Sequence, residues 1–179
     1  MSIDYAALWM LVVMNTMAIL LLVRQVATMP QFTRRTGPKA GTPVDDWSLE
    51  SVHGGIKHSA DLPDAYTLLF VASTCGPCHA LFAEMRRVGR PGGLLYVVGQ
   101  GDAEAMSKEA ESEQGPLFDL FLRGGRGEVY QKLGIPGTPW AVAVKGGRVE
   151  STGPASTAEQ LSRVCQAAMG TRDLEASIV

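Results

Sequence analysis

The chain has 179 residues, with 18 acidic and 16 basic side chains and a formal net charge of −2 at pH 7. This length accommodates one ordinary domain with an appendage, so we expect a single hydrophobic core. The near balance of charges gives no long-range field that would recruit nucleic acid, and we expect no nucleic-acid partner. Three cysteines are too few for a disulfide-stabilised scaffold.

Residues 6–23, AALWMLVVMNTMAILLLV, form an uncharged and largely apolar run. As a helix with a rise of about 1.5 Å per residue, the run reaches roughly 27 Å, close to the hydrocarbon thickness of a bilayer. It has no amphipathic pattern, which disfavours the alternative of a buried core helix. We therefore expect a membrane-spanning helix over 6–23, with the lipid bilayer as a partner, after an N-terminal tail of residues 1–5.

The flanks of the apolar run bear on its processing and orientation. A cleaved signal peptide requires a basic segment before the run and a small-x-small site after it, and neither is clear here. We expect the span to remain as a single-pass anchor. The nearby basic residues all follow the run, namely Arg24, Arg34, Arg35 and Lys39. Taken alone, the positive-inside rule places the rest of the chain in the cytoplasm.

The chain after the run divides by composition. Residues 24–43 carry several prolines and glycines and few apolar residues, which is typical of an extended linker. A folded domain is expected over 44–170, followed by a C-terminal tail over 171–179. No internal repeat or low-complexity tract within the domain suggests a repeat architecture.

Apolar periodicity within 44–170 predicts alternating strands and helices. The two clearest buried strands are each followed by a helix, and right-handed crossovers make such strands parallel neighbours. A hairpin near the C-terminus adds antiparallel strands, so the expected fold class is α/β with a mixed central sheet flanked by helices. The expected elements are strands at 47–52, 66–71, 94–98, 140–144 and 149–153, and helices at 79–88, 102–113 and 157–169.

Cys75-Gly-Pro-Cys78 lies where a predicted strand leads into a predicted helix. At the amino end of a helix, unpaired backbone N–H groups and the helix dipole stabilise a thiolate, so Cys75 is the expected nucleophile. Two intervening residues keep Cys78 close enough to resolve a mixed disulfide. Pro77 suits the first helical turn, and Gly76 lets a partner chain approach closely. We expect both of these residues to line the substrate-binding surface.

A zinc site is the main alternative for the cysteine pair, and it would require two further ligands. Cys165, His53, His58 and His79 are the candidates, but none of them forms a second closely spaced pair. We therefore expect redox chemistry, with no metal and no cofactor. His79 directly follows the pair and would either tune its proton transfers or simply be solvated. Cys165 lies between apolar neighbours in a predicted helix and is expected to be a buried, inert thiol.

Two motifs resemble those of the thioredoxin superfamily. Residues 70–78, FVASTCGPC, are similar to its active-site strand and loop, and residues 134–140, GIPGTPW, are similar to its cis-proline loop. The resemblance implies a thioredoxin-like fold and thiol–disulfide oxidoreductase activity. It also implies that the bond between Thr138 and Pro139 is cis, unlike most X-Pro bonds, and that these two residues contact a bound substrate chain.

The apolar N-terminal run and the segment 41–49, GTPVDDWSL, resemble the TlpA and MauD branch of the superfamily. Residues 24–26, RQV, are similar to MauD, which is associated with maturation of the disulfide-rich subunit of methylamine dehydrogenase. The resemblance implies a protein substrate that carries cysteines or a disulfide, and an electron donor or acceptor in the membrane or in solution. It also implies an extracytoplasmic domain, opposite to the side that the basic residues indicate.

Two positions depart from the thioredoxin pattern. Thioredoxin has a tryptophan before its first cysteine and a buried acid six positions before it, where this chain has Thr74 and Leu69. A buried carboxylate helps to deprotonate the resolving thiol, so its absence favours a dedicated partner over general protein reduction and leaves the direction of electron flow open.

Two alternative functions share this fold. A thiol peroxidase would place its cysteine after a proline-containing loop, and residues 70–74 contain no proline. A non-catalytic membrane assembly factor would use the fold only as a docking surface, and loss of the cysteine thiols would then leave its activity intact.

Overall fold

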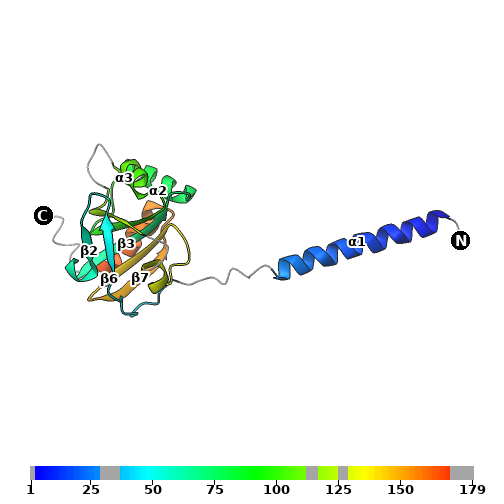
Figure 1. Cartoon of the computed structure of the whole chain (residues 1–179), viewed down its shortest axis with the longest axis horizontal. Helices are drawn as coiled ribbons and strands as arrows, with labels where there is room; N and C mark the ends of the chain where they lie inside the picture. The colour runs from blue at the N-terminus through cyan, green and yellow to red at the C-terminus, as the bar shows by residue number, and fades with distance from the viewer. Residues whose placement is uncertain (1–2, 29–36, 112–116, 125–128, 170–179) are drawn as a thin grey trace. The chain divides into compact units, whose positions relative to one another are not determined.

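The computed structural model describes residues 3–28, 37–111, 117–124 and 129–169 (Figure 1). Within the first of these ranges, the described side chains are those of residues 8–21 and Arg24. The chain separates into two compact units on either side of the boundary between residues 35 and 36.

Helix α1, Ile3–Thr28, contains the apolar run that the sequence predicts at 6–23. Its described large apolar side chains are exposed, from 47% at Val12 to 73% at Met10. Within the described part of the chain, no helix has both the length and the apolar character that a membrane crossing requires. The helix is therefore confirmed, whereas the span is not shown, and the two ends of the predicted run lie outside the described side chains.

The second unit is built on one mixed sheet in the order β2-β1-β5-β4-β3-β6-β7 (Figure 1). Strand β3 pairs in parallel with β4, and β4 in parallel with β5, whereas β6 runs antiparallel to β3. This arrangement confirms the predicted mixed sheet and the parallel pairing of its two buried strands. The strands are β1 Ser48–Ser51, β2 Ile56–His58, β3 Ala65–Ala72, β4 Leu95–Gln100, β5 Leu120–Arg123, β6 Trp140–Lys145 and β7 Arg148–Pro154.

The helices of this unit cover both faces of the sheet, so its central strands are buried on each side. Successive residues of β3 alternate between two apolar clusters: Leu69 belongs to one, and Leu68 and Phe70 belong to the other. This double burial explains why the strand reads as a continuous apolar run. The first cluster includes residues of α2, α3 and α5, and the second includes residues of α4. The helices are α2 Gly76–Val88, α3 Ala103–Ala110, α4 Val129–Lys132 and α5 Ala158–Met169, with a 3₁₀ turn η1 at Ser59–Asp61.

Four elements were not predicted from the sequence, namely β2, η1, β5 and α4. Strand β5 fills the sheet between β1 and β4, and it has only four residues, which give little periodic signal. Helix α4 is equally short, but it carries Tyr130, whose hydroxyl donates hydrogen bonds to the carbonyls of Val71 at 2.9 Å and Val98 at 3.0 Å. Tyr130 thus ties together the carboxyl ends of β3 and β4, where the active-site loop begins.

The folded part of the chain begins before the predicted boundary at Val44. The backbone N–H of Gly41 donates to the Val149 carbonyl at 2.7 Å, and the N–H of Val44 donates to the Gly147 carbonyl at 2.9 Å. The last residues of the predicted linker at 24–43 are therefore hydrogen-bonded to the β6–β7 hairpin.

Candidate active site

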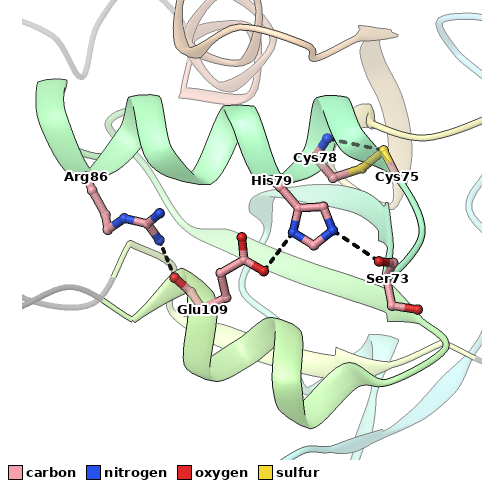
Figure 2. A network of polar contacts seen from close by, with 6 residues as sticks. All are labelled: Ser73, Cys75, Cys78, His79, Arg86 and Glu109. Carbon is pink, nitrogen blue, oxygen red and sulfur yellow. Dashed lines mark hydrogen bonds and ion pairs between the residues drawn. A yellow bond between two sulfur atoms is a disulfide. The ribbon is translucent and has the colours of Figure 1, made fainter.

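Cys75 and Cys78 form a disulfide at the amino end of α2, with sulfurs 2.09 Å apart and Cα atoms 5.3 Å apart (Figure 2). Cys75 is the N-cap of the helix, and the Cys78 backbone N–H donates a 3.2 Å hydrogen bond to its sulfur. Pro77 lies at the start of the helix, where its missing N–H has no intrahelical partner. The local sequence therefore places the pair where a backbone N–H of the first helical turn donates to the first sulfur.

The two sulfurs differ in access. Cys75 is 9% exposed, whereas Cys78 is 0% exposed. Cys75 is thus the less enclosed of the two, and the roles of nucleophile and resolving thiol remain a prediction. The first turn of α2 contains no acidic residue, so no carboxylate there opposes a thiolate on Cys75.

The peptide bond between Thr138 and Pro139 is cis, as the resemblance implied. Pro139 directly precedes β6, and Trp140 at the start of β6 pairs with Phe70 near the end of β3. Because β3 and β6 are antiparallel, the loop before β6 and the loop after β3 lie at the same edge of the sheet. The structure thus brings the two predicted motifs to one edge, and the substrate contacts of Thr138 and Pro139 remain a prediction.

His79 belongs to a network that the sequence did not reveal (Figure 2). Its Nδ1 lies 2.6 Å from a carboxylate oxygen of Glu109 on α3, and its Nε2 lies 3.0 Å from the Ser73 carbonyl oxygen. The hydrogen bond to the Ser73 carbonyl, and then that to Glu109, raises the pKa of His79 above its usual value. Arg86, further along α2, donates to the main-chain carbonyl of Glu109. Simple solvation of His79 is therefore wrong, and a role in the proton transfers of the cysteine pair remains a prediction.

The fold and the site can now be compared with known proteins. No protein-family model matches the sequence, and no curated protein matches it either. Solved structures of thiol–disulfide exchange proteins do match. The chain has a thioredoxin-like fold.

Three of the matching structures show the extent of the likeness. A candidate thiol:disulfide interchange protein DsbE from Chlorobium tepidum has a TM-score of 0.59 and 21% identity, over 74% of this chain and 99% of its own. A thio-disulfide isomerase from Thermus thermophilus has a TM-score of 0.51 and 23% identity, over 69% and 91%. A thioredoxin-family interchange protein from Chlorobium tepidum TLS has a TM-score of 0.52 and 19% identity, over 74% and 99%.

Within the thioredoxin-like fold, the position of the missing acid is an apolar site. Leu69 is 0% exposed and belongs to the same apolar cluster as both cysteines of the pair. Cys165 lies in that cluster too, and burial raises the pKa of its thiol to about 11. Cys165 is therefore buried, as the sequence predicts, and its inertness remains a prediction. Among the residues that the structure describes, no group of three or more His, Cys, Asp or Glu side chains could hold a metal ion.

An open, mainly polar cleft of about 610 Å³ adjoins the active-site loop of this thioredoxin-like domain. It lies at the carboxyl ends of β3, β4 and β5, and Thr74, directly before Cys75, forms part of its wall. Glu104 and Arg123 form an ion pair and line the cleft as well.

Proposed function

We propose that this chain is a thiol–disulfide oxidoreductase that exchanges disulfides with a partner protein through Cys75 and Cys78. One observation carries the proposal: a disulfide-bonded pair at the amino end of α2, in which Cys75 keeps 9% exposure and Cys78 none. Support comes from the cis-proline loop at the same edge of the sheet and from the likeness in fold to thiol–disulfide exchange proteins.

The site supports exchange in two steps. The reduced Cys75 thiolate attacks one sulfur of a partner disulfide, which forms a mixed disulfide and releases the partner's other sulfur as a thiolate. The Cys78 thiolate then attacks the Cys75 sulfur, which closes the internal disulfide and releases the second partner thiolate. The partner gains two electrons and this chain loses two. With a dithiol partner, the same steps run in reverse, and relative reduction potentials set the direction.

The proposed substrate surface surrounds Cys75. Gly76 and Pro77 are exposed, and a side chain at Gly76 would meet only open space, so a partner backbone can approach there. Thr138 is half-buried at the edge of the sheet that the cysteine loop shares. We expect a partner chain to lie along these residues and to extend toward the cleft beside Thr74. The exchange rate of a chain that carries Cys75→Ser tests the proposal.

We also propose that α1 anchors the protein in a membrane. The support is the uncharged run at 6–23 and the exposure of the described apolar side chains in that helix. Polypeptide backbone and apolar side chains in a helix of this kind are stable in hydrocarbon because every central backbone group is paired within the helix.

Removal of residues 1–28 should transfer the protein from the membrane pellet to the soluble fraction of its native host. The full chain should remain in the pellet after an alkaline carbonate wash, which removes peripheral proteins. As a matched control, Met14→Lys with Leu20→Lys should release the full-length chain, because each central lysine costs about 2.5–3.5 kcal/mol on insertion. Extraction of the unaltered chain by carbonate would contradict the anchor.

We further propose a dedicated partner of the MauD type on the extracytoplasmic side of that membrane. The resemblance of residues 24–26 and 41–49 to the TlpA and MauD branch supports this assignment, whereas the basic residues after α1 argue for the other side. The apolar site at Leu69 favours a single substrate over general protein reduction. Electrons would come from, or pass to, a membrane or soluble thiol–disulfide donor or acceptor.

A further inference from the structure

The His79 ring is held between two hydrogen-bond acceptors. A carboxylate oxygen of Glu109 lies 2.6 Å from one ring nitrogen, and the Ser73 carbonyl oxygen lies 3.0 Å from the other. A neutral imidazole carries one N–H and can donate to only one of them, whereas an imidazolium carries two. With Glu109 ionised, both hydrogen bonds therefore form only when His79 is protonated. We call this pair of hydrogen bonds, from His79 to Glu109 and to the Ser73 carbonyl, the bridge.

The Ser73 carbonyl belongs to the loop that carries Cys75. Two backbone hydrogen bonds that do not involve His79 also hold this loop. The Ser73 N–H donates to the Gln100 carbonyl at 3.0 Å, and the Cys75 N–H donates to the Ala72 carbonyl at 3.0 Å. Ser73 also packs closely on Gly101, where an added Cβ would lie 2.2 Å from the serine oxygen. The contact of the Ser73 carbonyl with His79 is a further restraint on this loop, and it is one that protonation can make or break.

We propose that His79 is a positioning residue of the active site, which in its charged form binds Glu109 and the Ser73 carbonyl and so fixes the loop that presents Cys75. This inference rests on the proposed exchange function and specifies how its site is regulated. His79 touches neither the partner nor the reacting sulfurs in this role. Loss of its charge frees the Ser73 carbonyl and lets the loop before the nucleophile relax.

The surroundings of His79 determine the sign of the pH effect. On α2, Arg86 binds the main-chain carbonyl of Glu109 and leaves the carboxylate to His79. On α3, Glu109 supplies the facing charge, while the carboxylate of Asp102 caps the helix at the Ala105 N–H. The active-site loop contributes Cys75 itself, as a thiolate when reduced. Both the carboxylate and the thiolate favour the imidazolium, so the bridge forms at low pH and opens as pH rises.

The test is the rate at which reduced full-length protein reacts with oxidised glutathione between pH 5 and pH 9, divided by the thiolate content of Cys75. For the unaltered chain, we expect this normalised rate to fall about tenfold as pH rises, because His79 then loses its charge. The fall should follow an ionisation whose pKa lies above the ordinary histidine value of about 6.5. His79→Ala should lose that ionisation. Glu109→Gln, which keeps the shape of the side chain but not its charge, should move the ionisation to lower pH.

Two further variants distinguish the positioning role of His79 from an effect of its charge alone and from a nonspecific effect of substituting a histidine. His79→Lys keeps a positive charge but cannot bridge two acceptors with a planar ring, so we expect it to resemble His79→Ala. His53→Ala alters an exposed histidine in the β1–β2 turn and should leave the profile unchanged. A His79→Ala profile equal to that of the unaltered chain, or a uniform loss at every pH, would overturn the positioning role. Failure of the unaltered chain to react at all would instead refute the exchange function.

Discussion

A chain with Cys75→Ser is expected to lose thiol–disulfide exchange by at least about a thousandfold, because a serine hydroxyl cannot form the mixed disulfide on which both steps depend. The measurement is the rate of disulfide reduction in a small protein substrate, with dithiothreitol as the electron source. Of the pair, only Cys78 would remain, and it is 0% exposed.

Cys165→Ala is the matched control for this experiment. It removes a thiol from the same apolar cluster, but one whose pKa is raised to about 11 by burial, so exchange should be unchanged. Full biological activity of the Cys75→Ser chain in its host would favour the docking-factor alternative. Rapid consumption of peroxide by the unaltered chain, abolished by the same substitution, would favour the peroxidase.

Leu69→Asp is expected to lower the free energy of unfolding by about 4 kcal/mol or more at pH 8, because it removes a buried leucine and places a carboxylate in an apolar cluster. The same change introduces an acid where thioredoxin has one. We therefore expect Cys78 to release a bound partner from Cys75 more rapidly than in the unaltered chain. Urea denaturation measures the first effect, and release of a chromophoric thiol from a preformed mixed disulfide measures the second.

The stability of the Leu69→Asp chain should depend on pH in a defined direction. Burial raises the pKa of the new carboxyl above its unfolded value of about 3.9. The protonated carboxyl is tolerated best, so relative stability is greatest below the unfolded pKa and is lost as pH rises through the folded-state value. Leu69→Asn has a similar shape and no charge, and its deficit should stay constant with pH. Equal pH profiles for the two variants would mean that this position is not the apolar site that the structure shows.

The sequence predicted the parts of the fold that depend on local patterns. Strand β3 reads as an unbroken apolar run because Leu68, Leu69 and Phe70 face two different clusters and all are buried. The Cys75-Gly-Pro-Cys78 motif and the proline at 139 are each recognisable from a few neighbouring residues, and the structure places both at one edge of the sheet.

Features that depend on distant contacts could not be predicted in this way. Strand β5 is defined by its pairing with β1 on one side and β4 on the other. Its four residues have no apolar pattern that distinguishes them from a loop. The contact between His79 and Glu109 joins two helices across 30 positions of sequence. Neither residue belongs to a motif, so only the packing of α2 beside α3 reveals that the histidine bridges to the active-site loop.

Capture of a partner by the Cys78→Ser chain tests the central proposal most directly. Without its resolving thiol, Cys75 should remain joined to the partner as a mixed disulfide that survives denaturation and dissociates on reduction. We expect mass spectrometry to locate the bond at Cys75 and to identify one predominant partner, whose compartment also fixes the side of the membrane. A Cys78→Ser chain from the native host that carries no mixed disulfide, or carries one at Cys165 instead, would contradict the assignment of Cys75 as the nucleophile.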